Sequence, residues 1–179
     1  TSSAASDVYK RQALGSKNLL VKVLPKMSNF LKTNGPWNQL VNLNNIQIQN
    51  TDFDESYLEL NNIHVTPIKV PHRDEYSETA GYIITGKNKK ALFIPDIDKW
   101  EKWDKKLIDL AKDFDYLLLD ATFYNSKEIS RDISEIPHPL VSETINLLDS
   151  LSKENKRKVY FIHMNHTNPM LDPNSCLLY

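Results

Sequence analysis

Three apolar runs of this sequence each lead into a histidine or an aspartate, and this repeated pattern limits the possible folds more than any other feature. The runs have the length of strands and are rich in β-branched and aromatic residues. They are residues 63–70 with His72, residues 90–95 with Asp96, and residues 159–162 with His163. Loops held at one edge of a rigid sheet carry many metal and catalytic sites. We therefore predict that these three side chains meet at one edge of a sheet.

The remaining periodicity predicts helices that cover this sheet. Apolar residues recur at helical spacing from Trp100 to Phe114. Asp98 is placed to cap that helix, which leaves Asp96 without a structural duty. We expect further strands at residues 19–24, 80–85 and 116–119, and a helix at residues 25–33. Hairpin strands followed by alternating strands and helices predict a layered α/β fold with a mixed sheet.

Composition excludes several classes of function. The 179 residues are enough for one domain with a real core, and the net charge of −1 gives no basic field for a nucleic-acid partner. No apolar run approaches the roughly 20 residues of a membrane-spanning helix. The one cysteine excludes a disulfide framework and a thiolate metal site. We expect a cytoplasmic protein, with a periplasmic location as the alternative, and nothing in the sequence indicates its oligomeric state.

The two ends of the sequence do not have the character of a protein. Residues 2–12 (SSAASDVYKRQ) can be back-translated to a transposase-type sequencing adapter, and residues 176–179 (CLLY) to the start of its reverse complement. We therefore expect residues 1–12 and 176–179 to be adapter-derived tails. Residues 13–175 are then a partial domain that lacks its natural upstream part.

Four of the five histidines are in positions that suit metal or acid–base chemistry. Neutral imidazole nitrogens and carboxylate oxygens are ligands that zinc and iron accept. A single loop histidine is usually an ordinary surface residue, but repeated placement after strands favours a site. His138 precedes Pro139, a residue typical of the first helical position, so we expect His138 to cap a helix whose dipole disfavours its charged form. That suits a group that transfers protons near neutral pH.

Six segments of the sequence are similar to the metallo-β-lactamase superfamily, and within it to the family of coenzyme PQQ synthesis protein B. They are VPHRDE (70–75), TAGY (79–82), FIPDID (93–98), LDATFY (119–124), IPHP (136–139) and FIHMNHTNPML (161–171). The resemblance implies an αββα sandwich with a metal site at one edge. It is incomplete, because the first histidine-rich motif of the superfamily (H-x-H-x-D-H) has no counterpart here.

The resemblance also implies roles for individual residues. His72, Asp96 and His163 would bind one or two iron or zinc ions, with Asp96 as a bridging ligand. Asp96 and His138 would take part in catalysis. Four further residues are expected to support these groups from around the site: Asp74, Asp120, Thr122 and His166. With about half of the family's metal ligands, these 179 residues alone are expected to bind metal weakly and to be inactive.

The sequence leaves three functions open. The resemblance implies the oxidative hydroxylation of a tyrosine-derived precursor during pyrroloquinoline quinone synthesis, with a small-molecule or peptide-derived substrate. The alternative is a zinc-dependent phosphodiesterase or esterase of the same fold, similar to the tRNA 3′-processing enzymes. A binding protein that has lost its metal is a third possibility, which the presence of His72, Asp96 and His163 disfavours.

Overall fold

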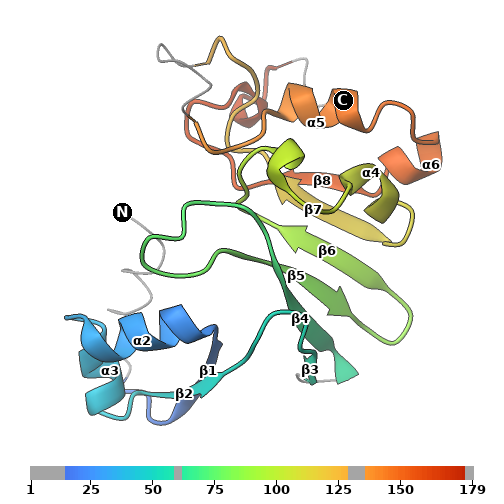
Figure 1. The fold of residues 1–179 in the computed structure, drawn as a ribbon. Helices are drawn as coiled ribbons and strands as arrows, with labels where there is room; N and C mark the ends of the chain where they lie inside the picture. Colours follow the sequence, from blue (N-terminus) through green and yellow to red (C-terminus); the bar gives the residue numbers. More distant parts are fainter. Residues whose placement is uncertain (1–14, 59–61, 129–135, 176–179) are drawn as a thin grey trace. The chain divides into compact units, whose positions relative to one another are not determined.

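The computed structural model describes residues 15–58, 62–128 and 136–175, so the predicted adapter-derived tails lie outside the described residues. The chain forms two compact units (Figure 1). The first contains the residues up to Phe53 together with Asp74–Glu78, and the second contains Asp54–Arg73 and the residues from Thr79 onward. Both units combine strands and helices, which confirms the predicted α/β class.

The first unit is a small strand–helix–strand arrangement. Strands β1 (Leu19–Val23) and β2 (Ile46–Asn50) pair in parallel, and helices α2 (Pro25–Thr33) and α3 (Asn38–Asn42) connect them. Its core consists of Leu40 and Ile46, with neighbouring apolar side chains packed against them. The strand and the helix predicted at residues 19–24 and 25–33 are thus confirmed, although the first residues of β1 are exposed rather than buried.

A distant carboxylate caps helix α2. Leu24 occupies the N-cap position and has no side chain that can accept a hydrogen bond. The carboxylate of Glu78 instead accepts hydrogen bonds from the backbone N–H groups of Lys26 (2.8 Å) and Met27 (3.2 Å). These are among the N–H groups that lack a partner within a helix, and a negative charge is favourable at this end of the helix dipole. This contact explains why the Asp74–Glu78 segment belongs to the first unit.

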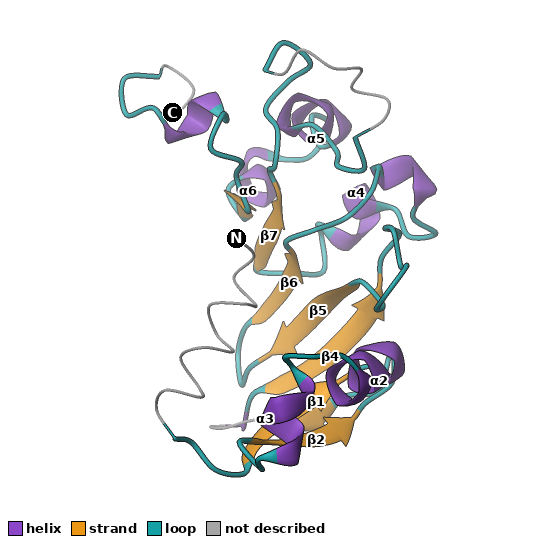
Figure 2. Cartoon of the chain, turned by 90° about the vertical axis from the view of Figure 1, so that its left-hand side faces the viewer, coloured by secondary structure: helices purple, strands orange, loops and turns teal. Residues whose placement is uncertain are grey.

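The second unit is built on one six-stranded mixed sheet with the order β3-β4-β5-β6-β7-β8 (Figures 1 and 2). The β3-β4, β4-β5 and β5-β6 pairs are antiparallel, whereas β6-β7 and β7-β8 are parallel. The strands are β3 (Tyr57–Leu58), β4 (His64–Lys69), β5 (Ala80–Thr85), β6 (Lys90–Ile94), β7 (Tyr116–Asp120) and β8 (Val159–Ile162). It follows that β4, β6, β7 and β8 all run in one direction, so their carboxyl ends lie at one edge.

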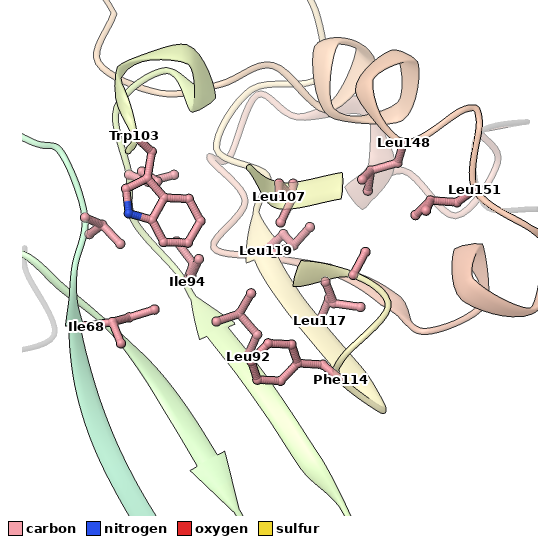
Figure 3. Packing of buried hydrophobic residues seen from close by; sticks show 13 residues of the cluster. Ile68, Leu92, Ile94, Trp103, Leu107, Phe114, Leu117, Leu119, Leu148 and Leu151 are labelled. Carbon is pink, nitrogen blue, oxygen red and sulfur yellow. The ribbon is translucent and has the colours of Figure 1, made fainter. Parts of the chain in front are cut away.

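The core of the second unit lies between this sheet and the segments that cross over it (Figure 3). Alternate residues of β6 and β7 point into it, and these four side chains have no exposed surface: Leu92, Ile94, Leu117 and Leu119. Leu107 of helix α4 (Leu107–Leu110) packs onto them from one crossover, and Leu148 from the other. The second crossover contains helices α5 (Val141–Leu147) and α6 (Lys153–Lys156). Burial of this apolar area, at about 25 cal/mol per Å², is what fixes the sheet.

The continuous helix predicted from Trp100 to Phe114 is not formed. The structure has a 3₁₀ turn, η2 (Trp100–Lys102), and then the short helix α4. The indole N–H of Trp100 donates to the Thr144 hydroxyl (2.8 Å), and that of Trp103 donates to the Lys69 carbonyl (2.9 Å). These tertiary bonds hold the chain in an irregular path. Helical spacing therefore identified the buried side chains correctly but not their backbone.

The start of helix α5 also differs from the prediction. Leu140, not His138, is the N-cap residue, and the helix begins at Val141. The Glu143 carboxylate accepts a hydrogen bond from the Leu140 N–H (2.9 Å). The Val141 N–H, in the first turn of the helix, has its own acceptor, because it donates to the Phe123 carbonyl (3.0 Å). His138 is thereby left outside the helix.

No helix in the described part of the chain is both long and apolar enough to cross a bilayer.

A charged cluster closes the turn between β5 and β6 and gives a testable pH dependence. Asp115 accepts hydrogen bonds from the Lys89 ammonium (2.6 Å) and the Lys90 N–H (2.9 Å), which lower the pKa of its carboxyl. This stabilisation is present above the unfolded-state pKa of about 3.9 and is lost as the pH falls through the lower folded-state value. In urea denaturation, we expect the parent chain to be more stable than Asp115→Asn near neutral pH, and this difference to shrink in acid. A difference that grew on acidification would contradict the assignment.

Candidate metal centre

The four parallel-running strands bring three potential ligands together at their carboxyl ends. His72 follows β4, and Asp96 follows β6. His138 comes from the crossover between β7 and β8. One ligand atom from each of the three side chains lies within 4.8 Å of the others. His72 Nε2 is 3.1 Å and His138 Nδ1 is 3.5 Å from Asp96 Oδ1. The predicted meeting of His72 and Asp96 is thus present, and His138 joins them.

Backbone hydrogen bonds fix the loops that carry His72 and Asp96. The Asp98 N–H donates to the Pro71 carbonyl (2.7 Å), which joins the residue before His72 to the second residue after Asp96. The Asp98 carboxylate accepts from the Lys99 N–H (2.7 Å) and the Lys102 ammonium (2.8 Å). Partial burial alone raises the pKa of Asp98, but these hydrogen bonds and the Lys102 charge together lower it below its usual value. Asp98 therefore stabilises the turn after Asp96 as an ionised side chain.

Asp120 is the buried acceptor beneath the site. Its side chain has no exposed surface. Its Oδ2 accepts from the Ile97 N–H (3.2 Å) and lies 2.8 Å from His138 Nδ1, while its Oδ1 accepts from the N–H (2.8 Å) and hydroxyl (2.7 Å) of Thr122. An ionised carboxylate in this position places the imidazole proton on Nδ1 and leaves Nε2 with a free lone pair. His138 Nδ1 thus lies near both Asp120 and Asp96, and Nε2 is the nitrogen left to bind a metal or to transfer a proton.

His163 lies on the other side of Thr122. The Thr122 hydroxyl is 3.2 Å from Nδ1 of His163 and 3.2 Å from Nδ1 of His138. The rings of the two histidines are 6.2 Å apart, and His163 is exposed. It is not one of the three residues that converge within ligand distance of one another. Its predicted role as a ligand stays a prediction, as does the predicted role of His138 in proton transfer.

The structure places the four predicted supporting residues differently. Asp120 and Thr122 contact the histidines directly. His166 is exposed, and its Nδ1 lies 3.1 Å from the side-chain oxygen of the adjacent Asn165. Asp74 belongs to the first unit. The supporting roles of all four stay predictions.

The chemistry of the convergent group fits a divalent metal ion. His72 Nε2 and Asp96 Oδ1 are both buried and have no hydrogen-bond partner, because their 3.1 Å approach does not have hydrogen-bond geometry. Unpaired buried polar atoms are costly and rare in proteins. A cation bound between them at about 2 Å would satisfy both atoms. The donor set of imidazole nitrogen and carboxylate oxygen suits zinc or iron.

A separate cavity of about 580 Å³ lies between the 99–108 segment and helix α5. Trp100, Trp103 and Leu147 provide apolar parts of its lining, and Lys99 and Glu143 provide charged parts. No histidine of the described residues lines it. The cavity is therefore not the place where a reactant would meet the convergent group.

Comparison with known proteins relates this geometry to a family. No curated protein sequence matches the chain significantly. Zinc-bound PqqB from Methylobacterium extorquens is similar in structure, with a TM-score of 0.70 and 18% sequence identity over 89% of this chain and 55% of that chain. A diphosphatase of the PhnP family has a TM-score of 0.56 and 18% identity over 86% of this chain and 50% of its own. The metallo-beta-lactamase fold protein YhfI from Bacillus subtilis has a TM-score of 0.57 and 15% identity over 89% of this chain and 57% of its own. The chain thus spans about half the length of each.

These similarities confirm the predicted fold. At such low identities the solved structures establish the architecture alone. The sequence adds an independent result, because residues 10–164 match the family described as "Beta-lactamase superfamily domain". This match covers most of the chain, and the chain belongs to the beta-lactamase superfamily.

Proposed function

We propose that this chain is part of a metal-dependent enzyme whose metal lies between His72 and Asp96. The observation that carries the proposal is the pair of buried, unpartnered ligand atoms, His72 Nε2 and Asp96 Oδ1, next to the His138 ring. Membership of a superfamily whose fold typically binds zinc or iron supports it, as does the zinc-bound state of the similar PqqB structure.

The residues around the metal would have two different roles, metal binding and proton transfer. Asp96 and His72 would bind the ion, with His163 completing its environment from the β8 end. Asp120 would hold the Nδ1 proton of His138, so that Nε2 can accept a proton from the reactant or return one. When bound, iron would supply redox chemistry with oxygen, and zinc would supply Lewis-acid chemistry.

For the reaction itself, we propose oxygen-dependent hydroxylation of a tyrosine-derived precursor, as in pyrroloquinoline quinone synthesis. The six sequence segments shared with the PQQ synthesis B family support this choice, and so does the structural similarity to PqqB. The substrate would be a small molecule or a peptide-derived compound. The fold alone does not decide which reaction takes place, because one fold hosts many reactions.

Hydrolysis of a phosphodiester or ester is the second candidate. A diphosphatase of the PhnP family matches 86% of this chain with a TM-score of 0.56. The His138–Asp120 pair would serve a hydrolase equally well, because it can protonate a leaving group. The two candidates differ in the metal that they need and in their dependence on oxygen.

The test uses the full-length gene product, purified without added metal, and its metal content measured by mass spectrometry. For the hydroxylase we expect iron, together with oxygen consumption that depends on a tyrosine-containing precursor. Two zinc ions per chain with turnover of bis(p-nitrophenyl) phosphate would refute the hydroxylase and support the hydrolase. A fully folded protein that neither contains nor binds metal would refute both.

A further inference from the structure

His163 has a backbone conformation that something else must hold in place. It follows β8 directly, and its φ angle is +61°, in the left-handed region. This region is unfavourable for a residue with a side chain, relative to right-handed backbone. The ring of His163 is exposed, so burial of the side chain does not offset that cost. The ring contacts Thr122, and the residues after His163 supply further interactions that hold its backbone.

Asn168 supplies those interactions. Its side chain is buried, with only 2% of its surface exposed. The amide group donates to the carbonyl oxygens of Ala121 (2.7 Å) and Thr122 (3.5 Å), while its oxygen accepts from the Met170 N–H (3.0 Å). One side chain thus joins the loop after β8 to the loop after β7.

The backbone on both sides of Asn168 reinforces this connection. The Asn168 N–H donates to the Asn165 carbonyl (2.9 Å), and the Asn165 N–H donates to the Thr122 carbonyl (3.0 Å). The segment from His163 to Asn168 is therefore folded back onto Ala121 and Thr122. Because Thr122 also contacts His138 and Asp120, the position of this segment sets the distance from His163 to the convergent group.

We propose that Asn168 is a positioning residue, which holds His163 against Thr122 at the edge of the metal centre. The task needs a donor and an acceptor on the same short side chain, and asparagine provides both. An aspartate of the same shape would set a carboxylate against two carbonyl oxygens. The placement of His163 does not depend on the proposed function, whereas its consequence for metal binding rests on it.

The experiment compares Asn168→Asp with Asn165→Asp in the complete chain. Asn165 is the matched control, because it lies on the same loop but its side-chain amide donates to the Thr167 hydroxyl (2.7 Å), within that loop. The proximity of the His163 ring to the Thr122 side chain, whose hydroxyl oxygen lies 3.2 Å from Nδ1, is read by nuclear Overhauser spectroscopy. We expect this signal to vanish in Asn168→Asp and to persist in Asn165→Asp. A signal that survives in Asn168→Asp, or that disappears in both variants, overturns the proposal.

A second variant and a second measurement keep the test decisive. If Asn168→Asp does not fold, the same signal is measured in Asn168→Ser, whose hydroxyl is too short to bridge both loops; an intact signal there overturns the proposal. Zinc affinity is measured in parallel by calorimetry on the full-length gene product. We expect it to fall about 10- to 100-fold in Asn168→Asp. If the His163–Thr122 signal vanished while the zinc affinity stayed unchanged, the positioning of His163 would be supported and its role as a ligand refuted.

Discussion

Replacing Asp120 with alanine is expected to lower the free energy of unfolding by at least about 3 kcal/mol, because each buried donor that loses its acceptor costs about 1–3 kcal/mol. The carboxylate has no exposed surface and serves four donors: the N–H groups of Ile97 and Thr122, the Thr122 hydroxyl and the His138 ring. Alanine would leave each of them without its acceptor. Urea denaturation followed by circular dichroism measures the loss.

Two controls separate this effect from a general effect of removing charge. Asp120→Asn keeps the size of the side chain and one carbonyl oxygen, so it should lose less stability than Asp120→Ala. Asp113 is an exposed aspartate of the same unit, and Asp113→Ala should stay within about 0.5 kcal/mol of the parent chain. Equal stability of Asp120→Ala and Asp113→Ala would contradict the role that we assign to the buried carboxylate.

Zinc affinity should fall at least about 100-fold on replacement of either unpartnered ligand, by His72→Ala or Asp96→Ala, because the loss of a ligand should exceed the 10- to 100-fold cost of losing an outer interaction. The physical reason is that each variant removes one of the two buried atoms that have no other partner. Calorimetric titration with zinc, on the full-length gene product, measures the affinity. In the same variants the free energy of unfolding of the metal-free protein should change little or rise, because each variant removes a buried polar atom that has no hydrogen-bond partner.

His64→Ala is the matched control for this experiment. His64 is an exposed histidine at the start of β4, at the opposite end of that strand from His72. Its replacement should leave zinc affinity unchanged. If His64→Ala weakened zinc binding as much as His72→Ala, the measured affinity would reflect scattered surface binding, and the candidate centre would be wrong.

The strand ends could be predicted from sequence because short-range pattern determines them. β5 (Ala80–Thr85) and β8 (Val159–Ile162) have the predicted bounds, and the residues after β4 and β6 converge as expected. Each of these strands is an apolar run with a clear polar boundary, and a common strand direction then brings the boundaries together. That much of the site follows from the one-dimensional pattern and the rules of sheet pairing.

The surroundings of His138 could not be predicted in the same way. The sequence favoured a helix cap, because Pro139 follows it and the helix dipole was the nearest visible influence. In the structure Glu143 binds the Leu140 N–H, and His138 bonds instead to Asp120 at the end of β7. That partner becomes a neighbour only after β7 has paired with its parallel strands. The same holds for the tryptophan hydrogen bonds that replace the helix expected from residues 100–114.

The direction of the strands also determines how far apart in sequence the contacts are that place each residue of the centre. His72 and Asp96 are joined by the antiparallel meander β4-β5-β6, in which each strand pairs with its neighbour in sequence. Asp120, His138 and His163 come together only after long crossovers have closed into the parallel pairs β6-β7 and β7-β8. Contacts between distant parts of a chain form more slowly than local ones, because the loop must be closed first. The two unpartnered ligand atoms, of His72 and Asp96, are thus placed by local contacts, whereas the positions of His138 and His163 depend on the most distant ones.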